Sequence, residues 1–390
     1  MRIKDIQEAL REESLDGWLF FDHHQRDELA YRVLQFKVPR IPTRRWYYLI
    51  PAQGEPQRLV HAIESGMLDA LPGTKHSYSS WQSQVDGLKK ILAGCHRIAM
   101  QYSPNCVIPY VSMVDGGTLE LVRDTGVEVA TSANLIQLFE ARWTAEQLEM
   151  HLEAGRRVDR VRAEAFQKIA SALNAGESID EWQVNRFIRD GFTKAGLVTD
   201  HGPIVAVNAN MSNPHYEPSP EGSHAIRKND AVLIDMWAKL DRPGAVYYDI
   251  TWTGHCGAAP PATIQNVFDV VTGARDRAIE RVKTAVSRNE QLHGFDVDDA
   301  CRGHIKEKGF GEYFVHRTGH SIGEDVHGTG ANMDNLETHD ERRVIARTCF
   351  SIEPGVYLPE FGIRSEVNMY VGEREAIVTG EIQKRLVAIV

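Results

Sequence analysis

Residues 231–254, with the sequence AVLIDMWAKLDRPGAVYYDITWTG, decide the fold of the larger part of this chain. Two apolar runs in this segment are typical of buried β-strands. Each run contains one carboxylate: Asp235 follows Ile234 in the first run, and Asp249 follows two tyrosines in the second. A carboxylate buried without a partner costs on the order of several kcal/mol, so each aspartate must be paired, protonated or bound to a metal ion. Taken singly, either aspartate could equally be a surface residue at the end of a strand.

Two glutamates and a histidine occur in similar surroundings further along the chain. Glu353 and Glu366 lie in CFSIEPGVYLPEFGIRSEVNMYV, and His320 lies in HRTGHSIGEDVHG, where Gly319 and Gly323 would allow close approach of the backbone. Two aspartates, one histidine and two glutamates suit a pair of divalent ions such as Mn, Co or Zn. Two such ions, about 3.5 to 4 Å apart and bridged by carboxylates, would activate one water for hydrolysis.

The order Asp, Asp, His, Glu, Glu, with DITWT, TGHSIGEDVH, SIEPGVY and GIRSE around the last four, resembles the pita-bread metallopeptidase family. This family includes methionine aminopeptidase, aminopeptidase P, prolidase and the metal-free creatinase. The resemblance covers roughly residues 142–385 and implies an α+β protein with a C-terminal pita-bread domain. The N-terminal part resembles, in size and pattern, the smaller α/β creatinase-type domain of aminopeptidase P and prolidase. The family also implies a homodimer.

The resemblance implies a metal-binding role for five residues. Asp235 and Asp249 are similar to the paired aspartates, the second of which bridges both ions. His320 is similar to the sole histidine ligand, and Glu353 and Glu366 are similar to the glutamate ligands, with Glu366 bridging. The implied cofactor is therefore two divalent metal ions.

Further residues resemble those that bind substrate and assist catalysis. His215 in SNPHYEPSP is similar to the family histidine near the substrate amide. His316 and His327 are similar to the pair that binds the substrate carbonyl and stabilises the tetrahedral intermediate, and Glu353 would pass a proton to the departing nitrogen. Arg364 is similar to the arginine beside the bridging glutamate in the proline-specific branch. The implied substrate is a proline-containing dipeptide or short peptide, hydrolysed at its N-terminal Xaa-Pro bond.

The chain departs from the family pattern at two places. Thirteen residues separate Asp235 from Asp249, whereas the family usually has ten, and a longer hairpin turn through residues 241–244 would accommodate the difference. Trp252 replaces the usual arginine of DITRT. Because neighbouring residues of a strand point to opposite faces, we expect Trp252 to leave the metal site undisturbed.

Two other functions compete with a metal-dependent peptidase. Gly319 to Gly323 satisfy the G-x-S-x-G pattern of a serine hydrolase with Ser321 as nucleophile, but EDVHGTG after it does not have a helical pattern. A non-catalytic relative that only binds peptides is the second alternative. Such relatives generally lose metal ligands, whereas all five are present here, which favours catalysis.

The distribution of apolar residues predicts two domains, 1–141 and 142–390. In the first, the apolar runs GWLFF, RWYYLIP, QRLVHAI, HRIAMQY and VEVATSA alternate with helical patterns, as in a small α/β domain. Basic and aromatic residues gather in residues 32–48, which form either a binding edge or a solvated rim beside a buried strand. In the second, Thr144 with Gln147, and Ser178 with Glu181, match the capping box that begins a helix.

Composition limits the classes of partner. The 390 residues include 44 Lys plus Arg and 54 Asp plus Glu, a formal charge of −10, which argues against nucleic-acid binding. No apolar run approaches the roughly 18 residues that span a bilayer, the N-terminal sequence lacks a signal-peptide pattern, and the five cysteines form no CxxC pair. We therefore expect a cytoplasmic protein with reduced cysteines and no membrane segment.

The sequence leaves the length of the substrate and the identity of the metal open. A dipeptidase needs a cation to bind the free carboxylate of its substrate, and Arg317, Arg342 and Arg343 are candidates. An ordinary surface charge is the favoured interpretation for each of these arginines.

Overall fold

The computed structural model describes residues 2–38 and 40–390. The chain divides into two compact units, Met1–Glu140 and Ala141–Val390, one residue before the boundary expected from the sequence. None of the described helices combines the length and apolar character that a membrane-spanning segment requires. All five cysteines are free.

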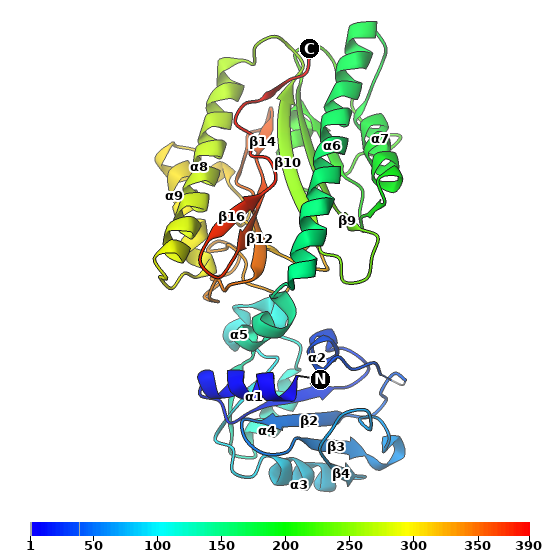
Figure 1. The fold of residues 1–390 in the computed structure, drawn as a ribbon, viewed down its shortest axis with the longest axis vertical. Helices are drawn as coiled ribbons and strands as arrows, with labels where there is room; N and C mark the ends of the chain where they lie inside the picture. The colour runs from blue at the N-terminus through cyan, green and yellow to red at the C-terminus, as the bar shows by residue number, and fades with distance from the viewer. Residues whose placement is uncertain (1, 39) are drawn as a thin grey trace. The chain divides into compact units, whose positions relative to one another are not determined.

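The first unit is built on a six-stranded mixed sheet with the strand order β4-β3-β2-β1-β5-β6 (Figure 1). Its strands are β1 (Gly17–Asp22), β2 (Trp46–Pro51), β3 (Gln57–His61), β4 (Thr74–Tyr78), β5 (Arg97–Met100) and β6 (Glu128–Thr131). Its helices are α1 (Ile3–Glu12), α2 (Glu28–Leu34), α3 (Trp81–Ile91), α4 (Gly116–Arg123) and the short α5 (Ala133–Ile136). The five strands expected from apolar runs are confirmed. β4 lacks such a pattern because it is an edge strand on which only Tyr78 is buried.

Side chains of the central strands alternate between two cores in the first unit. Trp18 and Tyr48 pack with α1 and α2 on one face of the sheet. Leu19 and Tyr47 pack with α3 and α4 on the other face. The period of two along each strand thus produces a sheet covered by helices on both sides, which is the α/β organisation expected for this unit.

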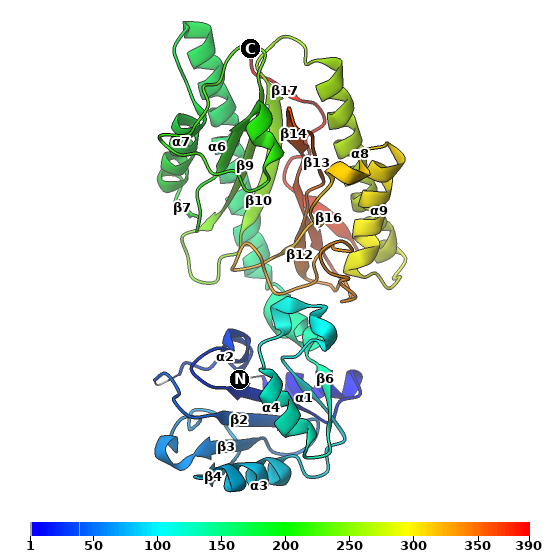
Figure 2. The same ribbon diagram turned by 180° about the vertical axis from the view of Figure 1, so that it is seen from behind.

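The second unit has two groups of helices outside and strands between them (Figures 1 and 2). Its long helices are α6 (Ala145–Ala175), α7 (Glu181–Lys194), α8 (Ala262–Ser287) and α9 (Gly294–Glu307). One sheet contains β7 (Leu197–Val198), β8 (Ile204–Val207), β9 (Ala231–Leu240), β10 (Tyr248–His255) and β17 (Val387–Ala388). The others contain β11 (Ser321–Ile322), β12 (Thr348–Ile352), β15 (Val367–Val371) and β16 (Ala376–Thr379), and the pair β13 (Gly355–Tyr357) and β14 (Gly362–Arg364). α6 and α7 pack on β8–β10, and α8 and α9 pack on β12, β15 and β16.

One of the two expected capping boxes is correct and the other is wrong. The Thr144 side chain accepts a hydrogen bond from the backbone of Gln147, whose own side chain accepts one from Thr144, at the start of α6. At α7 the capping residue is Asp180 rather than Ser178. Glu181 does not cap because its buried carboxylate instead accepts hydrogen bonds from the backbone amides of residues 207 and 224.

The β9–β10 hairpin has the longer turn that the sequence suggests. β9 ends at Leu240 and β10 begins at Tyr248, and the register places Thr251 opposite Asp235. Trp252 lies on the other face, where its ring packs with the α6 core and the guanidinium of Arg162 is 3.5 Å from the ring centroid. The replacement of the family arginine by Trp252 therefore changes the helix side of the strand and not the side that carries the carboxylates.

His151 on α6 links three elements of the second unit through a fully buried ring. Its Nδ1–H donates to the backbone carbonyl of Tyr247, 2.7 Å away, and its Nε2 accepts the hydroxyl of Thr379 at 2.6 Å. Burial lowers the pKa of His151 from 6.5 to about 4. The native state therefore holds this histidine neutral at a pH where the unfolded chain already takes up a proton.

This shift makes the free energy of unfolding depend on pH. The contribution of neutral His151 is complete above pH 6.5 and is lost as the pH falls toward 4. Between pH 7.5 and 5.5, we expect the wild type to lose about 1 kcal/mol more free energy of unfolding than His151→Gln. Urea unfolding at both pH values measures the difference. The exposed His224 gives a matched control, because His224→Gln should keep the wild-type slope.

Candidate metal centre

The five predicted metal ligands come from both halves of the second unit. Asp235 lies on β9 and Asp249 on β10, whereas His320 precedes β11, Glu353 follows β12 and Glu366 precedes β15. Four of the side chains are buried, and that of Glu353 is 17% exposed. The alternation along β9 and β10 explains the burial of the aspartates, because residues 234, 236 and 250 pack toward α6 while the carboxylates face the other sheet.

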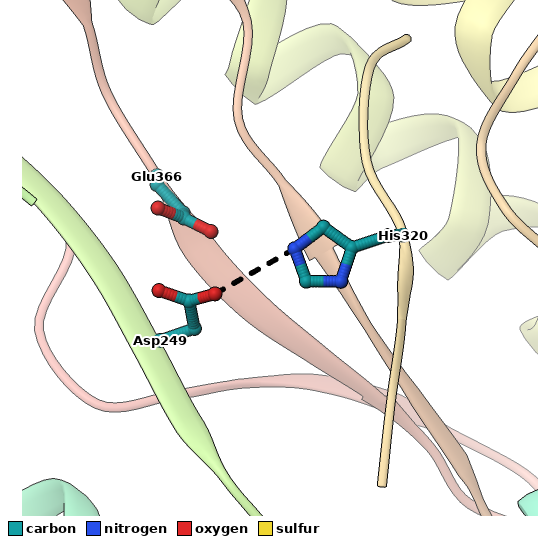
Figure 3. A group of neighbouring side chains, drawn as sticks. All are labelled: Asp249, His320 and Glu366. Carbon is teal, nitrogen blue, oxygen red and sulfur yellow. Dashed lines mark ion pairs between the residues drawn. The ribbon is translucent and has the colours of Figure 1, made fainter. Parts of the chain in front are cut away.

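Ligand atoms of Asp249, His320 and Glu366 lie within 4.8 Å of one another (Figure 3). The Nε2 atom of His320 is 3.6 Å from Oδ2 of Asp249 and 3.4 Å from Oε1 of Glu353. Four of the five predicted ligands thus meet around one imidazole nitrogen. Asp235 stands on the neighbouring strand and contacts the guanidinium of Arg364.

Hydrogen bonds fix the orientation of the His320 ring. Its Nδ1–H donates to the backbone carbonyl of Ser321 at 3.1 Å, so the lone pair of Nε2 points toward the carboxylates. Its backbone N–H donates to the hydroxyl of Ser351 at 2.9 Å, and that hydroxyl donates to Glu353 at 3.1 Å. This is the arrangement expected of a histidine that binds a metal through Nε2.

A second set of hydrogen bonds joins the remaining carboxylates. Arg364 donates to Asp235, to the hydroxyl of Thr251 at 3.1 Å and to the hydroxyl of Tyr357 at 3.0 Å. The Thr251 hydroxyl donates in turn to Oε2 of Glu366 at 2.7 Å. Thr251 and Arg364 thereby set the orientation of one carboxylate on each half of the unit.

Burial and mutual repulsion shift the pKa values of these acids. Burial raises the pKa of Asp235 to about 7, although Arg364 opposes the rise. Burial and the charge of Glu353 raise the pKa of Asp249 well above its ordinary value, and burial and Asp249 do the same for Glu366. The four carboxylates therefore need additional positive charge in order to remain ionised together.

Glu353 differs from the other three acids. Burial would raise its pKa, but the charges of His320, His316 and Arg364 outweigh this effect and lower the pKa below its ordinary value. Glu353 is consequently the member of the set that ionises most readily.

Unpaired oxygens show that these residues suit a divalent ion. Oδ1 of Asp235, Oδ1 of Asp249 and Oε1 of Glu366 are buried and have no hydrogen-bond partner among the described residues. A buried polar atom without a partner costs about 1 to 3 kcal/mol, which coordination would recover. Carboxylate oxygens with an imidazole nitrogen are ligands that Mn, Co and Zn accept.

Residues 149–373, more than half of the chain, match metallopeptidase family M24. The chain belongs to this family. An Xaa-Pro dipeptidase of Lactobacillus helveticus is 26% identical over 295 residues, which cover 75% of this chain and 73% of that protein. Four other bacterial relatives match over only 51 to 61% of their own length, so the chain spans little more than half of them.

Solved structures of similar proteins share the fold. The dipeptidase PepE of Mycobacterium ulcerans has a TM-score of 0.69 at 21% identity, covering 100% of this chain and 97% of that one. A prolidase of Thermococcus sibiricus has a TM-score of 0.64 at 22% identity, covering 99% and 98%. The expected α+β class with a pita-bread domain is thereby confirmed.

Three further histidines resemble accessory residues of the family, and two of them lie beside the candidate ligands. The ring of His327 stands edge-on to that of His320, with centroids 4.4 Å apart. The charge of His320, followed by burial, lowers the pKa of His327 to about 4. Nε2 of His316 is 2.7 Å from the hydroxyl of Tyr357. His215 is exposed, and no described contact joins it to the ligands, so its role stays a prediction.

The segment that carries His316 and His320 is held by two buried residues of α9 that the sequence analysis does not identify. Arg302 forms a two-pronged ion pair with Asp298 and also donates to the backbone carbonyls of Phe314, at 3.0 Å, and His316, at 2.7 Å. Asp298 accepts the backbone N–H and the hydroxyl of Thr318, at 3.0 and 2.7 Å. On a helix, an aspartate and an arginine four residues apart resemble an ordinary surface pair, so the sequence carries no signal of this role.

Of the two glycines beside His320, only one is required by close packing. A Cβ atom on Gly319 would lie 1.9 Å from the backbone oxygen of Ser351, whereas one on Gly323 would meet nothing closer than 3.9 Å. The expectation is therefore correct for Gly319 and wrong for Gly323. A larger residue at 319 would push the histidine segment away from β12.

The serine hydrolase alternative does not fit the geometry of Ser321. This residue is buried in a two-residue strand, and its hydroxyl accepts the backbone N–H of Gly330 at 3.0 Å. Turns and loops follow it, whereas a nucleophile elbow requires a helix directly after the strand. The G-x-S-x-G match is thus a coincidence of glycines and a structural serine.

The contacts of Arg302 make it a positioning residue for the candidate metal site. Arg302→Lys keeps the charge near Asp298 but cannot reach both carbonyls, because lysine lacks the planar fork. We expect the affinity for a divalent ion to fall by about 10- to 100-fold and the free energy of unfolding by about 2 kcal/mol. Competition with a chelating dye and urea unfolding measure these effects. Arg277→Lys, at an exposed arginine of α8, is the control and should change neither quantity.

Proposed function

We propose that this chain is a metal-dependent peptidase that hydrolyses the N-terminal Xaa-Pro bond of dipeptides or short peptides. The observation that carries the proposal is the convergence of Asp249, His320, Glu353 and Glu366 in one buried site, with Asp235 on the adjoining strand. Membership of M24 and a relative named Xaa-Pro dipeptidase support the reaction and the substrate class.

The five ligands would hold two divalent ions, such as Mn, Co or Zn. When bound, such ions lower the pKa of a water toward about 7 and neutralise negative charge that develops during hydrolysis. The three unpaired carboxylate oxygens support this assignment. Glu353 would carry the proton to the departing nitrogen, for which its partial exposure and its position beside His320 suit it.

The accessory residues would bind the substrate carbonyl and stabilise the oxyanion. His327 adjoins His320 and is exposed to solvent, so it can present an N–H to a group bound at the proposed ligands. Nδ1–H of His316 donates to the carbonyl of Arg317, and Nε2 accepts the hydroxyl of Tyr357. A direct hydrogen bond from His316 to substrate therefore requires Tyr357 to release this contact. Tyr357, tied to Arg364, is a further candidate for orienting substrate.

Proline restricts how the substrate can be recognised. An Xaa-Pro amide has no N–H, so its recognition depends on the shape of a pocket for the ring and on the free amino group. His215 and Arg364 are the remaining residues proposed to bind substrate. Assembly as a homodimer and a location in the cytoplasm are further parts of the proposal, supported by resemblance to the family.

Metal content and one variant test whether the site acts as a metal centre. We expect the purified protein to bind about two equivalents of divalent ion, and exhaustive chelation or Asp249→Ala to abolish hydrolysis of Xaa-Pro substrates. Elemental analysis and a coupled assay for released proline make the measurement. Asp241→Ala, in the exposed turn of the same hairpin, should retain full metal content and activity. Activity that survived chelation would contradict the proposal, and protein that bound peptide without hydrolysis would show a non-catalytic relative.

A substrate series tests the specificity. We expect the enzyme to release the N-terminal residue of Ala-Pro or Ala-Pro-Ala. This release should be at least about tenfold faster than release from Ala-Ala and Ala-Ala-Ala. Comparing kcat/KM between Ala-Pro and Ala-Pro-Ala then separates a dipeptidase from an aminopeptidase. Equal rates with and without proline would remove the Xaa-Pro assignment while leaving the metal centre in place.

A further inference from the structure

The first unit contains an open cleft of about 540 Å³ at one end of its sheet. Strands β1, β3 and β4 end at the cleft, β2 begins there, and α3 and α4 start beside it. Buried Phe21, Tyr78 and Gln84 form part of its lining. Clefts beyond the carboxyl ends of strands are common binding places in α/β folds, and this volume lies within the usual range for small-molecule sites.

The cleft is positively charged although the whole chain is acidic. Arg26, Arg44 and Arg45 line it together with Asp115 and two histidines, whereas the chain carries a net charge of −10. Among the described residues, none of the three arginines forms an ion pair with a carboxylate. Arg26 donates to His23 and Arg44 donates to Thr43, but each guanidinium keeps further N–H groups that can bind an anion from solution.

The electrostatic environment of His23, which also lines the cleft, agrees with this charge. Burial lowers its pKa, and the charges of His24, Arg26 and Arg45 lower it further. Arg26 also donates a hydrogen bond to the carbonyl of His23 at 2.8 Å. Several positive charges thus lie around the His23 side chain, and their combined potential favours a negatively charged ligand there.

An exposed tryptophan borders the same cleft. Trp81 is the first residue of α3, and 70% of its surface is exposed although it is among the largest apolar side chains. An aromatic ring in this position offers a face on which a planar ring can stack. The N-terminus of α3 adds partial positive charge on the same side.

We propose that this cleft binds a small anion that carries a planar ring, with Arg26, Arg44 and Arg45 holding its phosphate or carboxylate and Trp81 stacking on the ring. Arg44 and Arg45 belong to the basic and aromatic segment 32–48, so this segment is a binding edge rather than a solvated rim. Guanidinium groups bind phosphate and carboxylate through the same paired donors. The site lies in the first unit and does not depend on the peptidase reaction.

Calorimetric titration of the full chain tests the proposal with four probes. Adenosine 5′-monophosphate and nicotinate carry a ring with a phosphate or a carboxylate, whereas adenosine lacks the anion and inorganic phosphate lacks the ring. We expect at least one ring anion to bind with a Kd below about 1 mM, and adenosine and phosphate to bind at least about tenfold more weakly. Whichever of the two ring anions binds more tightly shows whether the cleft prefers a phosphate or a carboxylate. No binding of either ring anion at about 10 mM overturns the proposal.

Variants assign the binding to the cleft rather than to the metal centre. The double variant Arg44→Ala with Arg45→Ala should weaken the ring anion by at least about tenfold, while Lys89→Ala with Lys90→Ala should leave it unchanged. The control pair removes two charges from exposed positions at the end of α3. Trp81→Ala should weaken the ring anion and leave inorganic phosphate unaffected. Unchanged affinity in the arginine variant, with an unchanged melting curve, contradicts the anion site, and unchanged affinity in Trp81→Ala contradicts stacking.

Discussion

The crowding of four carboxylates in the interior is the constraint on which the second unit depends. Removing an ionised acid from water costs several kcal/mol, roughly, and each further acid nearby adds repulsion. Asp235, Asp249 and Glu366 respond with raised pKa values, and Arg364 neutralises part of the charge. Without cations, a fold that keeps these carboxylates together would be destabilised by their burial and mutual repulsion. Bound divalent ions would offset this unfavourable free energy, because the same groups would then act as ligands. The arrangement is therefore intelligible as a metal centre and unfavourable as a core.

The strands reconcile this polar centre with a stable protein. Along β9 and β10, alternate residues pack against α6 or face the opposite sheet, so a single segment supplies both apolar core and ligands. The other ligands come from the half covered by α8 and α9, where Arg302 and Asp298 secure the histidine segment. Each half is anchored by its own helices, and the ligands meet where the two halves face one another.

The four acidic candidate ligands could be predicted from the sequence because acids inside apolar strands contradict the usual pattern of burial. Residues that support the ligands gave no such signal. In the sequence, Tyr357 resembles an ordinary core aromatic residue and Arg302 resembles a surface charge on a helix. Both nevertheless form hydrogen bonds with His316. The cleft in the first unit was visible only in part, because Arg44 belongs to a recognisable basic run whereas Trp81 comes from a distant helix. Contacts between residues remote in sequence are thus what the sequence fails to predict, together with the capping residue of α7, which is Asp180 and not Ser178.

The length of the turn between β9 and β10 does not determine how the residues of the two strands face one another. Thr251 faces Asp235 because of strand register, whatever number of residues joins the strands. Residues 241–243 at the tip are exposed and lie outside the ladder. This tip is accordingly a place where a short peptide tag or a fluorophore can be inserted, reporting on a hairpin whose two strands each carry one candidate ligand, without altering either of them.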